Sequence, residues 1–459
     1  MSKILQTINT PADLKKVRST DLPKLAEEVR DELVEVCSKN GGHLGSNLGV
    51  TEMTLALHRV FNSPQDKFIF DVSHQGYVHK MLTGRREYLH TLRQTDGCSG
   101  FLQREESVHD HFGAGHAGTA FSAALGFAAA RDQKKSKEHV VAIVGDGAFG
   151  CGVSLEALNN VIETTDQMIV ILNDNKMSIS PNVGGLSKYL NRIITDNRYT
   201  TIKHGLGDII SKIPAIGGKI KKTLGKIDEA AKSFISPGAV FEELGLKYYG
   251  PIDGHDIHGL IEILENVKQS RKPVLLHVLT EKGHGFNPAG MDPEKCHGFK
   301  KVKDSKSSEA MTPVPSTGIS FSDSFANSLC KMAATDERIV AITAGMLSGT
   351  GIGKLKSVMP DRVYDVGIAE EHATIFAGGL AANGLRPIVG IYATFMQRAM
   401  DCVFHDICLQ ELPVIFCMDR AGLVEDGPTH HGIQDISFWK TMPNLTIMQP
   451  RDDQEIAEM

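Results

Sequence analysis

Two short polar motifs in the first half of the chain each follow a strongly apolar run. A Gly-Asp-Gly motif at residues 145–147 comes directly after Val140–Val144, and an Asn-Asp-Asn motif at residues 173–175 follows Met168–Leu172. Apolar runs of this length that end in Gly or polar residues are typical of buried parallel strands. Since parallel strands end at one edge of a sheet, where ligands bind, the two motifs are expected to lie close together.

These motifs supply oxygen ligands for a hard divalent cation. Asp146 offers a carboxylate, and Asn175, which lies 29 positions later, offers an amide oxygen. Magnesium accepts such ligands together with phosphate oxygens and water. Gly147 and Ala148 are small enough for the backbone to approach a phosphate closely. The alternative is a turn and a helix cap without a ligand, but two such motifs at this spacing favour a site for magnesium and a diphosphate.

The elements that must position these motifs alternate between strands and helices. In the first half, a third strand is predicted at Val274–Leu279, and Leu155–Glu163 is predicted to be a crossover helix. The second half has predicted strands at Ile339–Thr343, Pro387–Ile391, Val414–Met418 and Leu445–Met448. This pattern predicts an α/β fold with two consecutive doubly wound parallel-sheet domains. Their expected bounds are 1–305 and 319–459, joined by a Lys-, Ser- and Pro-rich linker at 306–318.

Two segments depart from this alternation. Residues from about 181 to 237 are rich in Gly and Lys and contain no strand pattern. We expect an insertion there, either mobile over the active site or lying on the surface. At the end of the sequence, Asp452 and Asp453 predict the cap and first turn of a helix, but the sequence stops at Met459. Because so short a helix is marginal alone, we expect the second domain to be truncated at its C-terminus.

The composition restricts the partners and the compartment. The net charge of −6 gives no reason to expect nucleic acid or an anionic membrane as a partner. The sequence has neither a signal-peptide pattern nor an apolar run of the roughly 18 residues that a membrane span needs. Its eight cysteines include no CxxC pair. We therefore expect a cytoplasmic protein whose thiols are reduced.

Longer stretches of the sequence resemble one enzyme family. The motifs in the first half are GGHLGSNLGV from Gly41, DVSHQGYVHKMLTGR from Asp71, GHAGTAFSAALG from Gly115, GDGAFGCGVSLEALN from Gly145 and LNDNKMSIS from Leu172. Those in the second half are DVGIAEEHA from Asp365, IYATFMQRAMD from Ile391 and DRAGLVEDGPTHHG from Asp419. Together they are similar to the 1-deoxy-D-xylulose-5-phosphate synthase family, which lies within the thiamine-diphosphate-dependent, transketolase-like superfamily.

The resemblance implies a reaction and an assembly. Members of this family are transferases that condense pyruvate with D-glyceraldehyde 3-phosphate to 1-deoxy-D-xylulose 5-phosphate and carbon dioxide, for isoprenoid and thiamine biosynthesis. They use thiamine diphosphate and Mg2+ and are expected to be homodimers. A third domain of the family is expected to be absent here. The alternatives are transketolase-type two-carbon transfer and a non-catalytic, truncated cofactor-binding scaffold.

The resemblance also implies which residues hold the cofactor. Asp146, Asn175 and the main-chain carbonyl of Met177 are implied to bind the metal. Glu370 is the implied partner of the pyrimidine ring of the cofactor, whereas a surface carboxylate is the alternative. Further cofactor contacts are implied for His74, Gly115, His116, Ala117, Gly147, Ala148, Asn175, Lys282 and Phe395.

Substrate contacts follow from the same resemblance. His43 and His430 are the implied catalytic imidazoles, since histidine titrates near neutral pH, although a positioning role is equally open. Arginine suits phosphate because it binds with two parallel hydrogen bonds, while a structural ion pair is the alternative. The implied substrate-binding residues are Tyr392, Arg398, Arg420, Asp426 and His297.

Overall fold

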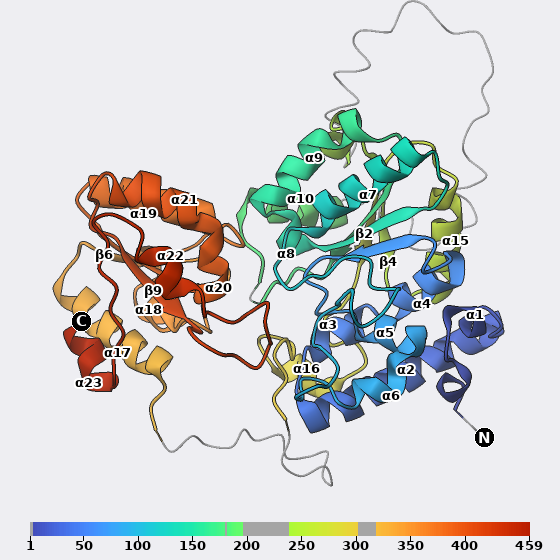
Figure 1. Ribbon diagram of the computed structural model, residues 1–459, viewed down its shortest axis with the longest axis horizontal. Helices are drawn as coiled ribbons and strands as arrows, with labels where there is room; N and C mark the ends of the chain where they lie inside the picture. The colour runs from blue at the N-terminus through green and yellow to red at the C-terminus, as the bar shows by residue number, and fades with distance from the viewer. Residues whose placement is uncertain (1–2, 180, 196–237, 302–317) are drawn as a thin grey trace, which may run out of the picture.

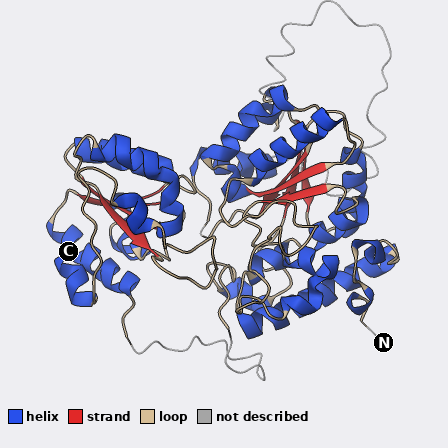
Figure 2. Cartoon of the chain, in the orientation of Figure 1, coloured by secondary structure: helices blue, strands red, loops and turns tan. Residues whose placement is uncertain are grey.

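The computed structural model describes residues 3–179, 181–195, 238–301 and 318–459, which form two α/β units (Figure 1). Each unit has a parallel sheet at its centre with helices around it (Figure 2). The first unit contains a five-stranded sheet and the second a four-stranded sheet. No helix in the described residues is long and apolar enough to cross a membrane.

The first sheet has the strand order β1-β2-β3-β5-β4. Its strands are β1 (Lys67–Phe70), β2 (Val140–Gly145), β3 (Ile169–Asp174), β4 (Lys247–Asp253) and β5 (Val274–Leu279). All neighbouring pairs are parallel. The three predicted strands are confirmed as β2, β3 and β5. Strands β1 and β4 were not predicted, because one is very short and the other is only half buried and polar at its start.

Helices cover both faces of this sheet. Along β2, Val140, Ala142 and Val144 pack into one core, and Val141 and Ile143 pack into another. The first core includes α7 (Ala120–Lys134), α9 (Gly152–Thr164), α10 (Gly184–Thr195) and α14 (Ala239–Glu243), and the second includes α4 (Thr51–Val60) and α15 (Ile257–Lys268). Two covered faces explain why Val140–Val144 of β2 is apolar at every position. The predicted crossover helix is confirmed as α9.

Further helices complete the first unit. They are α1 (Pro11–Leu14), α2 (Leu22–Asn40), α3 (Leu44–Gly49), α5 (Tyr77–Lys80), α6 (Arg86–Leu89), α8 (Asp146–Phe149) and α16 (Asn287–Met291). Helix α2, the longest of them, packs its apolar face into a third core that also holds Leu44, Tyr77 and Phe299. This core supports the loops that carry the histidines described below.

The structure describes only the first part of the insertion predicted at 181–237. Its first part forms α10, in which Leu190 and Ile193 are buried in the core of the first unit. Leu186, Leu190 and Ile193 recur at helical spacing, so this part is a helix packed on the first unit. Residues 196–237, and the predicted linker up to Thr317, lie outside the described residues.

The second sheet has the strand order β7-β6-β8-β9 and is also parallel. Its strands are β6 (Ile339–Thr343), β7 (Val363–Asp365), β8 (Arg386–Tyr392) and β9 (Ile415–Asp419). The helices are α17 (Phe321–Thr335), α18 (Ile352–Val358), α19 (Glu370–Ala382), α20 (Ala393–Met396), α21 (Met400–Cys402), α22 (Asp435–Trp439) and α23 (Asp453–Glu458). The predicted final helix is confirmed, since Asp452 caps α23 by accepting the Glu455 N–H.

One predicted strand of this unit is wrong. Leu445–Met448 has no ladder partner in the described chain, and β9 is the last strand of the sheet on that side. The side chains of Ile447 and Met448 are 43% and 58% exposed. An apolar run becomes a strand only where a neighbouring strand takes up its backbone hydrogen bonds, and here none does.

Candidate active site

A cavity lies between the two units, at the carboxyl ends of strands from both sheets. From the first unit it is lined by Asp146, Gly147, Gly150, Ser178, Pro181, Asn182, Val183, Leu186 and Ser187, and from the second by Gly345, Asp365, Val366, Gly367 and Ile368. Asp146 begins α8 directly after β2, and Asp365 ends β7. The position is the one at which open parallel sheets bind ligands.

Asp146 and Asp174 form a buried acidic pair at one end of this cavity. Both accept the backbone N–H of Lys176, Asp146 Oδ2 at 2.7 Å and Asp174 Oδ1 at 3.1 Å. Burial, and then the charge of Asp174, raise the pKa of Asp146 well above its usual range. Burial is the largest single influence on Asp174 and opposes its ionisation, but the hydrogen bond with His277 Nε2 at 2.9 Å, the interaction with Asp146 and the charge of His277 together outweigh it and lower the pKa of Asp174.

The other predicted metal ligands lie on the same loop. Asn175 Oδ1 accepts the Met177 N–H at 2.9 Å. Within the described residues, no group of three His, Cys, Asp or Glu side chains is placed to hold a metal ion. The donors available near Asp146 are therefore one or two carboxylates with amide and carbonyl oxygens, a set that suits a hard cation and does not suit zinc.

Lys282 brings a positive charge to this end of the cavity. It follows β5, is 5% exposed, and donates from Nζ to the Ser178 carbonyl at 2.8 Å. Burial lowers the pKa of Lys282 to about 8, although Glu294 and Asp146 oppose the shift. Gly147 faces Ser178 across the same space, where an added Cβ would lie 3.0 Å from the Ser178 side chain.

Glu370 begins α19, two residues after the cavity-lining Ile368. Its side chain is buried, Oε2 has no hydrogen-bond partner, and the nearest cation is Arg398, whose Nη1 lies 3.8 Å away. Burial raises the pKa of Glu370 to about 7. Arg398 itself donates to the Ala117 carbonyl and to Cys151 Sγ, so it is held inside the contact between the two units.

The predicted histidines belong to one chain of ring contacts that crosses from the first unit to the second. His43 lies 5.4 Å from His74 and 5.5 Å from His297 between ring centroids. Phe101 is 5.4 Å from His43 and stacks on His430 at 4.7 Å with an interplanar angle of 10°. Through these contacts four of the five predicted imidazoles form one surface.

The same chain of rings continues in the second unit. His430 lies 5.4 Å from Phe395, which is 4.9 Å from His116 and 5.9 Å from Tyr392. The Arg420 guanidinium lies over the Tyr392 ring at 4.4 Å. His116 Nε2 bonds across the units to Thr394 Oγ1 at 3.1 Å and to the Thr429 carbonyl at 2.7 Å.

Burial makes these imidazoles poor bases. It lowers the pKa of His74 and of His430 to about 3, and it lowers the pKa of His43 and His297 well below their usual range. All four are therefore neutral at pH 7. Each has one N–H to donate and one nitrogen that accepts.

The two predicted phosphate-binding arginines have different surroundings. Arg420 is paired with Asp419 and donates to the Gly349 carbonyl at 3.1 Å, whereas Arg398 lies beside Glu370.

Asp426 lies 3.9 Å from His43 Nε2 and is in contact with Arg93. Gly115 contacts Thr429 so closely that an added Cβ would lie 2.6 Å from its side chain.

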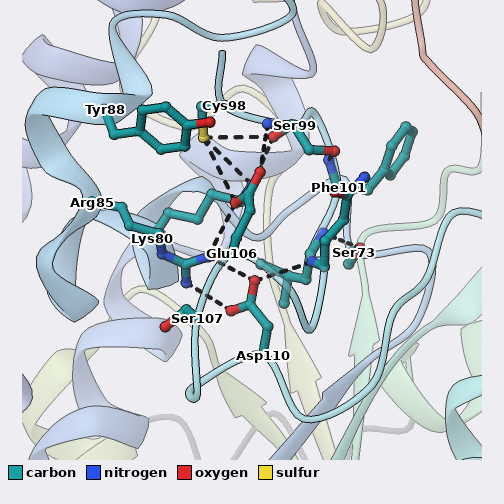
Figure 3. Close-up of polar contacts among 12 residues, drawn as sticks. Ser73, Lys80, Arg85, Tyr88, Cys98, Ser99, Phe101, Glu106, Ser107 and Asp110 are labelled. Carbon is teal, nitrogen blue, oxygen red and sulfur yellow. Dashed lines mark hydrogen bonds and ion pairs between the residues drawn. The ribbon is translucent and has the colours of Figure 1, made fainter. Parts of the chain in front are cut away.

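Two site-lining residues, Arg93 and Phe101, were not predicted from the sequence. The segment just before Phe101 is anchored at Ser99 to a buried ionic cluster of Lys80, Arg85, Glu106 and Asp110 (Figure 3). The completely buried Lys80 donates to Glu106 Oε2 at 2.7 Å, and Glu106 Oε1 accepts the Ser99 N–H at 2.7 Å. Arg93 is recognised as part of the site only from its contact with Asp426, which joins segments that lie far apart in the sequence.

The fold, together with two family profiles that match the chain, defines a class of protein: a thiamine-diphosphate enzyme of the transketolase-like type. Residues 5–280 match the profile described as 1-deoxy-D-xylulose-5-phosphate synthase, and residues 317–459 match the pyrimidine binding domain of transketolase. The chain belongs to the 1-deoxy-D-xylulose-5-phosphate synthase family.

Curated relatives support this assignment over the whole chain. The chain is 52% identical over 460 residues to the 1-deoxy-D-xylulose-5-phosphate synthase of Methylacidiphilum infernorum, covering 100% of this chain and 72% of the relative. It is also 52% identical to the 1-deoxy-D-xylulose-5-phosphate synthase of Caldanaerobacter subterraneus subsp. tengcongensis, covering 99% of this chain and 73% of that relative. A solved transketolase from Campylobacter jejuni is 18% identical with a TM-score of 0.46, covering 93% of this chain and 74% of that chain, a similarity too low to add to the assignment.

The family assignment confirms the predicted class, fold and reaction. The chain has the transketolase-like α/β fold, with two parallel-sheet domains in sequence. Its family consists of thiamine-diphosphate-dependent transferases that join pyruvate to D-glyceraldehyde 3-phosphate with loss of carbon dioxide. The chain spans about 72% of the length of the first of these relatives.

Proposed function

We propose that the cavity between the units binds Mg2+ and thiamine diphosphate, and that the surrounding residues condense pyruvate with D-glyceraldehyde 3-phosphate. The observation that carries this proposal is the buried Glu370 carboxyl, which has an unpartnered oxygen and stands two residues after Ile368, in the lining of the cavity that Asp146 also lines. A buried polar atom without a partner is costly unless a ligand satisfies it.

The first unit would hold the charged end of the cofactor. Asp146, Asn175 and the Met177 carbonyl supply oxygen ligands for Mg2+, and the cation would relieve the repulsion between Asp146 and Asp174. The backbone at Gly147 and Ala148 and the Lys282 ammonium would face the diphosphate. This fits the donor set, because magnesium takes few protein ligands and completes its shell with phosphate oxygens and water.

The second unit would hold the ring end of the cofactor. When bound, the cofactor supplies the nucleophilic carbon and the electron sink for decarboxylation. Glu370, whose pKa is raised to about 7, would share its proton with a ring nitrogen. Phe395 and His116 would pack along the ring, and His74, Gly115 and Ala117 would line the path between the two ends.

The substrates would lie along the surface of imidazole rings. His43 and His430 are neutral, so each would hold or move a proton at a substrate oxygen through its free ring nitrogen, while His297 orients the substrate. Asp426 would accept a hydrogen bond from a substrate hydroxyl. Arg420 and Tyr392 would bind the phosphate of the aldehyde, and Arg398 would reach it only by leaving the Ala117 carbonyl.

The decisive test is an assay of the chain with Mg2+, thiamine diphosphate, pyruvate and D-glyceraldehyde 3-phosphate. We expect carbon dioxide and 1-deoxy-D-xylulose 5-phosphate to form together, and Glu370→Gln to abolish both. Glu371→Gln is the matched control, because the neighbouring side chain is partly exposed. Product from a ketose phosphate donor would favour transketolase-type transfer, and cofactor binding without any product would favour a non-catalytic scaffold.

We also propose the predicted domains, assembly and location. Domain bounds of 1–305 and 319–459 with a linker at 306–318 are supported by the two sheets, which share no strand. A cytoplasmic location is supported by the eight cysteines, all of which are free thiols. The net charge of −6 supports the absence of nucleic-acid and membrane partners. A homodimer rests on the resemblance to the family alone, and sedimentation would test it.

A further inference from the structure

We propose that Tyr77 and Asn47 are positioning residues that fix the orientation of His43 and the place of its ring proton. Both residues are completely buried and hydrogen-bonded to His43, so they would act through the imidazole. The inference rests on the proposed role of His43 in substrate chemistry, and it adds which nitrogen of that ring carries the hydrogen.

Asn47 ties together the two loops that carry His43 and His74. It is completely buried in α3, and its Nδ2 donates to the His43 carbonyl at 2.8 Å and to the His74 carbonyl at 2.7 Å. Its Oδ1 accepts the Tyr77 N–H at 2.8 Å. Both amide hydrogens are thereby used, and a single side chain sets the separation of the two imidazoles.

The Tyr77 hydroxyl determines the tautomer of His43. Tyr77 is completely buried, and its hydroxyl has two hydrogen-bond partners in the described structure, both on His43. The His43 backbone N–H donates to the hydroxyl oxygen at 3.2 Å, and His43 Nδ1 lies 3.3 Å from it. The hydroxyl proton has no other acceptor, and leaving it unbonded in a buried site would be costly. Nδ1 is therefore the acceptor, which places the ring proton on Nε2.

The Nε2–H of His43 is then free to meet a ligand. Its nearest carboxylate oxygen belongs to Asp426 at 3.9 Å, which is too far for a hydrogen bond. The ring stays neutral because burial, together with His74 and His297, lowers the pKa of His43. A neutral Nε2–H can polarise a substrate carbonyl without introducing a positive charge.

The neighbouring backbone makes room for the hydroxyl. Gly42 has φ +137°, and an added Cβ would lie 3.1 Å from Tyr77 Oη and 3.0 Å from the Leu92 side chain. Only glycine adopts this conformation freely. The Gly-Gly-His sequence before α3 thus positions His43 against Tyr77.

The test reads the tautomer directly by NMR of the full chain labelled with 15N-histidine. The His43 ring signals are identified by subtracting the spectrum of His43→Gln. We expect wild-type shifts typical of an Nε2–H ring, and a mixture of both tautomers in Tyr77→Phe, which lacks the donor. Tyr88→Phe is the matched control, since that partly exposed hydroxyl donates to the Asp96 carbonyl. An Nδ1–H ring in the wild type, or an unchanged ring in Tyr77→Phe, would overturn the inference.

Kinetics separate this inference from the proposed function on which it rests. We expect Tyr77→Phe to lower kcat about tenfold with little change in KM for pyruvate, because only the proton position changes. If His43→Gln turns over normally, the proposed role of His43 is wrong. If His43→Gln is slow while Tyr77→Phe turns over normally, His43 is functional but the inference about Tyr77 is wrong.

Discussion

Glu370 Oε2 lies 3.8 Å from Arg398 Nη1, yet this carboxyl oxygen receives no hydrogen bond. Arg398 instead donates to the Ala117 carbonyl and to Cys151 Sγ. The attraction of Arg398 therefore only moderates the effect of burial, which raises the pKa of Glu370 to about 7. Without a ligand, burial therefore destabilises the ionised form of Glu370 near neutral pH, as expected of the proposed partner of a ring nitrogen.

Glu370→Gln is expected to stabilise the cofactor-free protein at alkaline pH while abolishing activity. The unfolded carboxyl ionises near pH 4.5 and the folded one near pH 7. The folded state thus binds more protons between these values, and wild-type stability falls as pH rises through this window, by up to about 3 kcal/mol. Glu370→Gln has no carboxyl to ionise at this position, so its stability should not fall in this way as pH rises.

Urea unfolding at pH 5 and pH 8 checks this expectation. The stability difference between Glu370→Gln and wild type should grow from pH 5 to pH 8, whereas Glu371→Gln, which removes only the smallest of the causes that act on the pKa of Glu370, should show a much smaller trend. A difference that is constant with pH would contradict the raised pKa of Glu370.

Asp146→Asn is expected to weaken the binding of thiamine diphosphate in the presence of Mg2+. The substitution removes a carboxylate ligand and also the repulsion with Asp174, so the cofactor-free protein should not lose stability. In calorimetric titrations, thiamine diphosphate should bind the variant at least about tenfold more weakly in the presence of Mg2+. Asp166→Asn, an exposed position in the turn before β3, should bind like the wild type. Unchanged Mg2+-dependent affinity in Asp146→Asn would contradict the metal site.

Glu106→Gln is expected to destabilise the protein by about 3–5 kcal/mol. The change leaves Lys80, which is completely buried, without its carboxylate and also removes the ion pair with Arg85. Chemical denaturation measures the loss. The adjacent Glu105→Gln is the control, because that side chain is exposed and its substitution should cost no more than about 0.5 kcal/mol. Equal effects of the two substitutions would show that the cluster in Figure 3 contributes nothing specific.

The buried histidines are expected to make the protein sensitive to acid. Burial lowers the pKa of His74 and His430 from 6.5 to about 3. The unfolded chain therefore binds more protons below pH 6.5, and the contribution of each residue to stability is lost as pH falls from 6.5 towards 3, at about 1.4 kcal/mol per pH unit. His74→Gln and His430→Gln should flatten this decline in unfolding experiments. His405→Gln, whose side chain is 68% exposed, should not.

The parts of the site that could be predicted from the sequence are those that depend on short, continuous segments of it. Asp146 and Asn175 each stand directly after a predicted strand, and parallel strands must end at a common edge. Glu370 and the histidines were identified only because the surrounding motifs resemble a family. Leu445–Met448 shows the limit of this reasoning, because an apolar run does not reveal whether a neighbouring strand is present.

The sequence by itself determined the alternation of strands and helices, the family, and which polar residues follow the strands. Those features depend on neighbours along the chain, so local patterns carry them. Only the tertiary structure decided that Tyr77 bonds His43, that Phe101 stacks on His430, and that Arg398 lies beside Glu370. Such contacts join residues far apart in the sequence, and the burial that shifts their pKa values exists only once the two units have packed together.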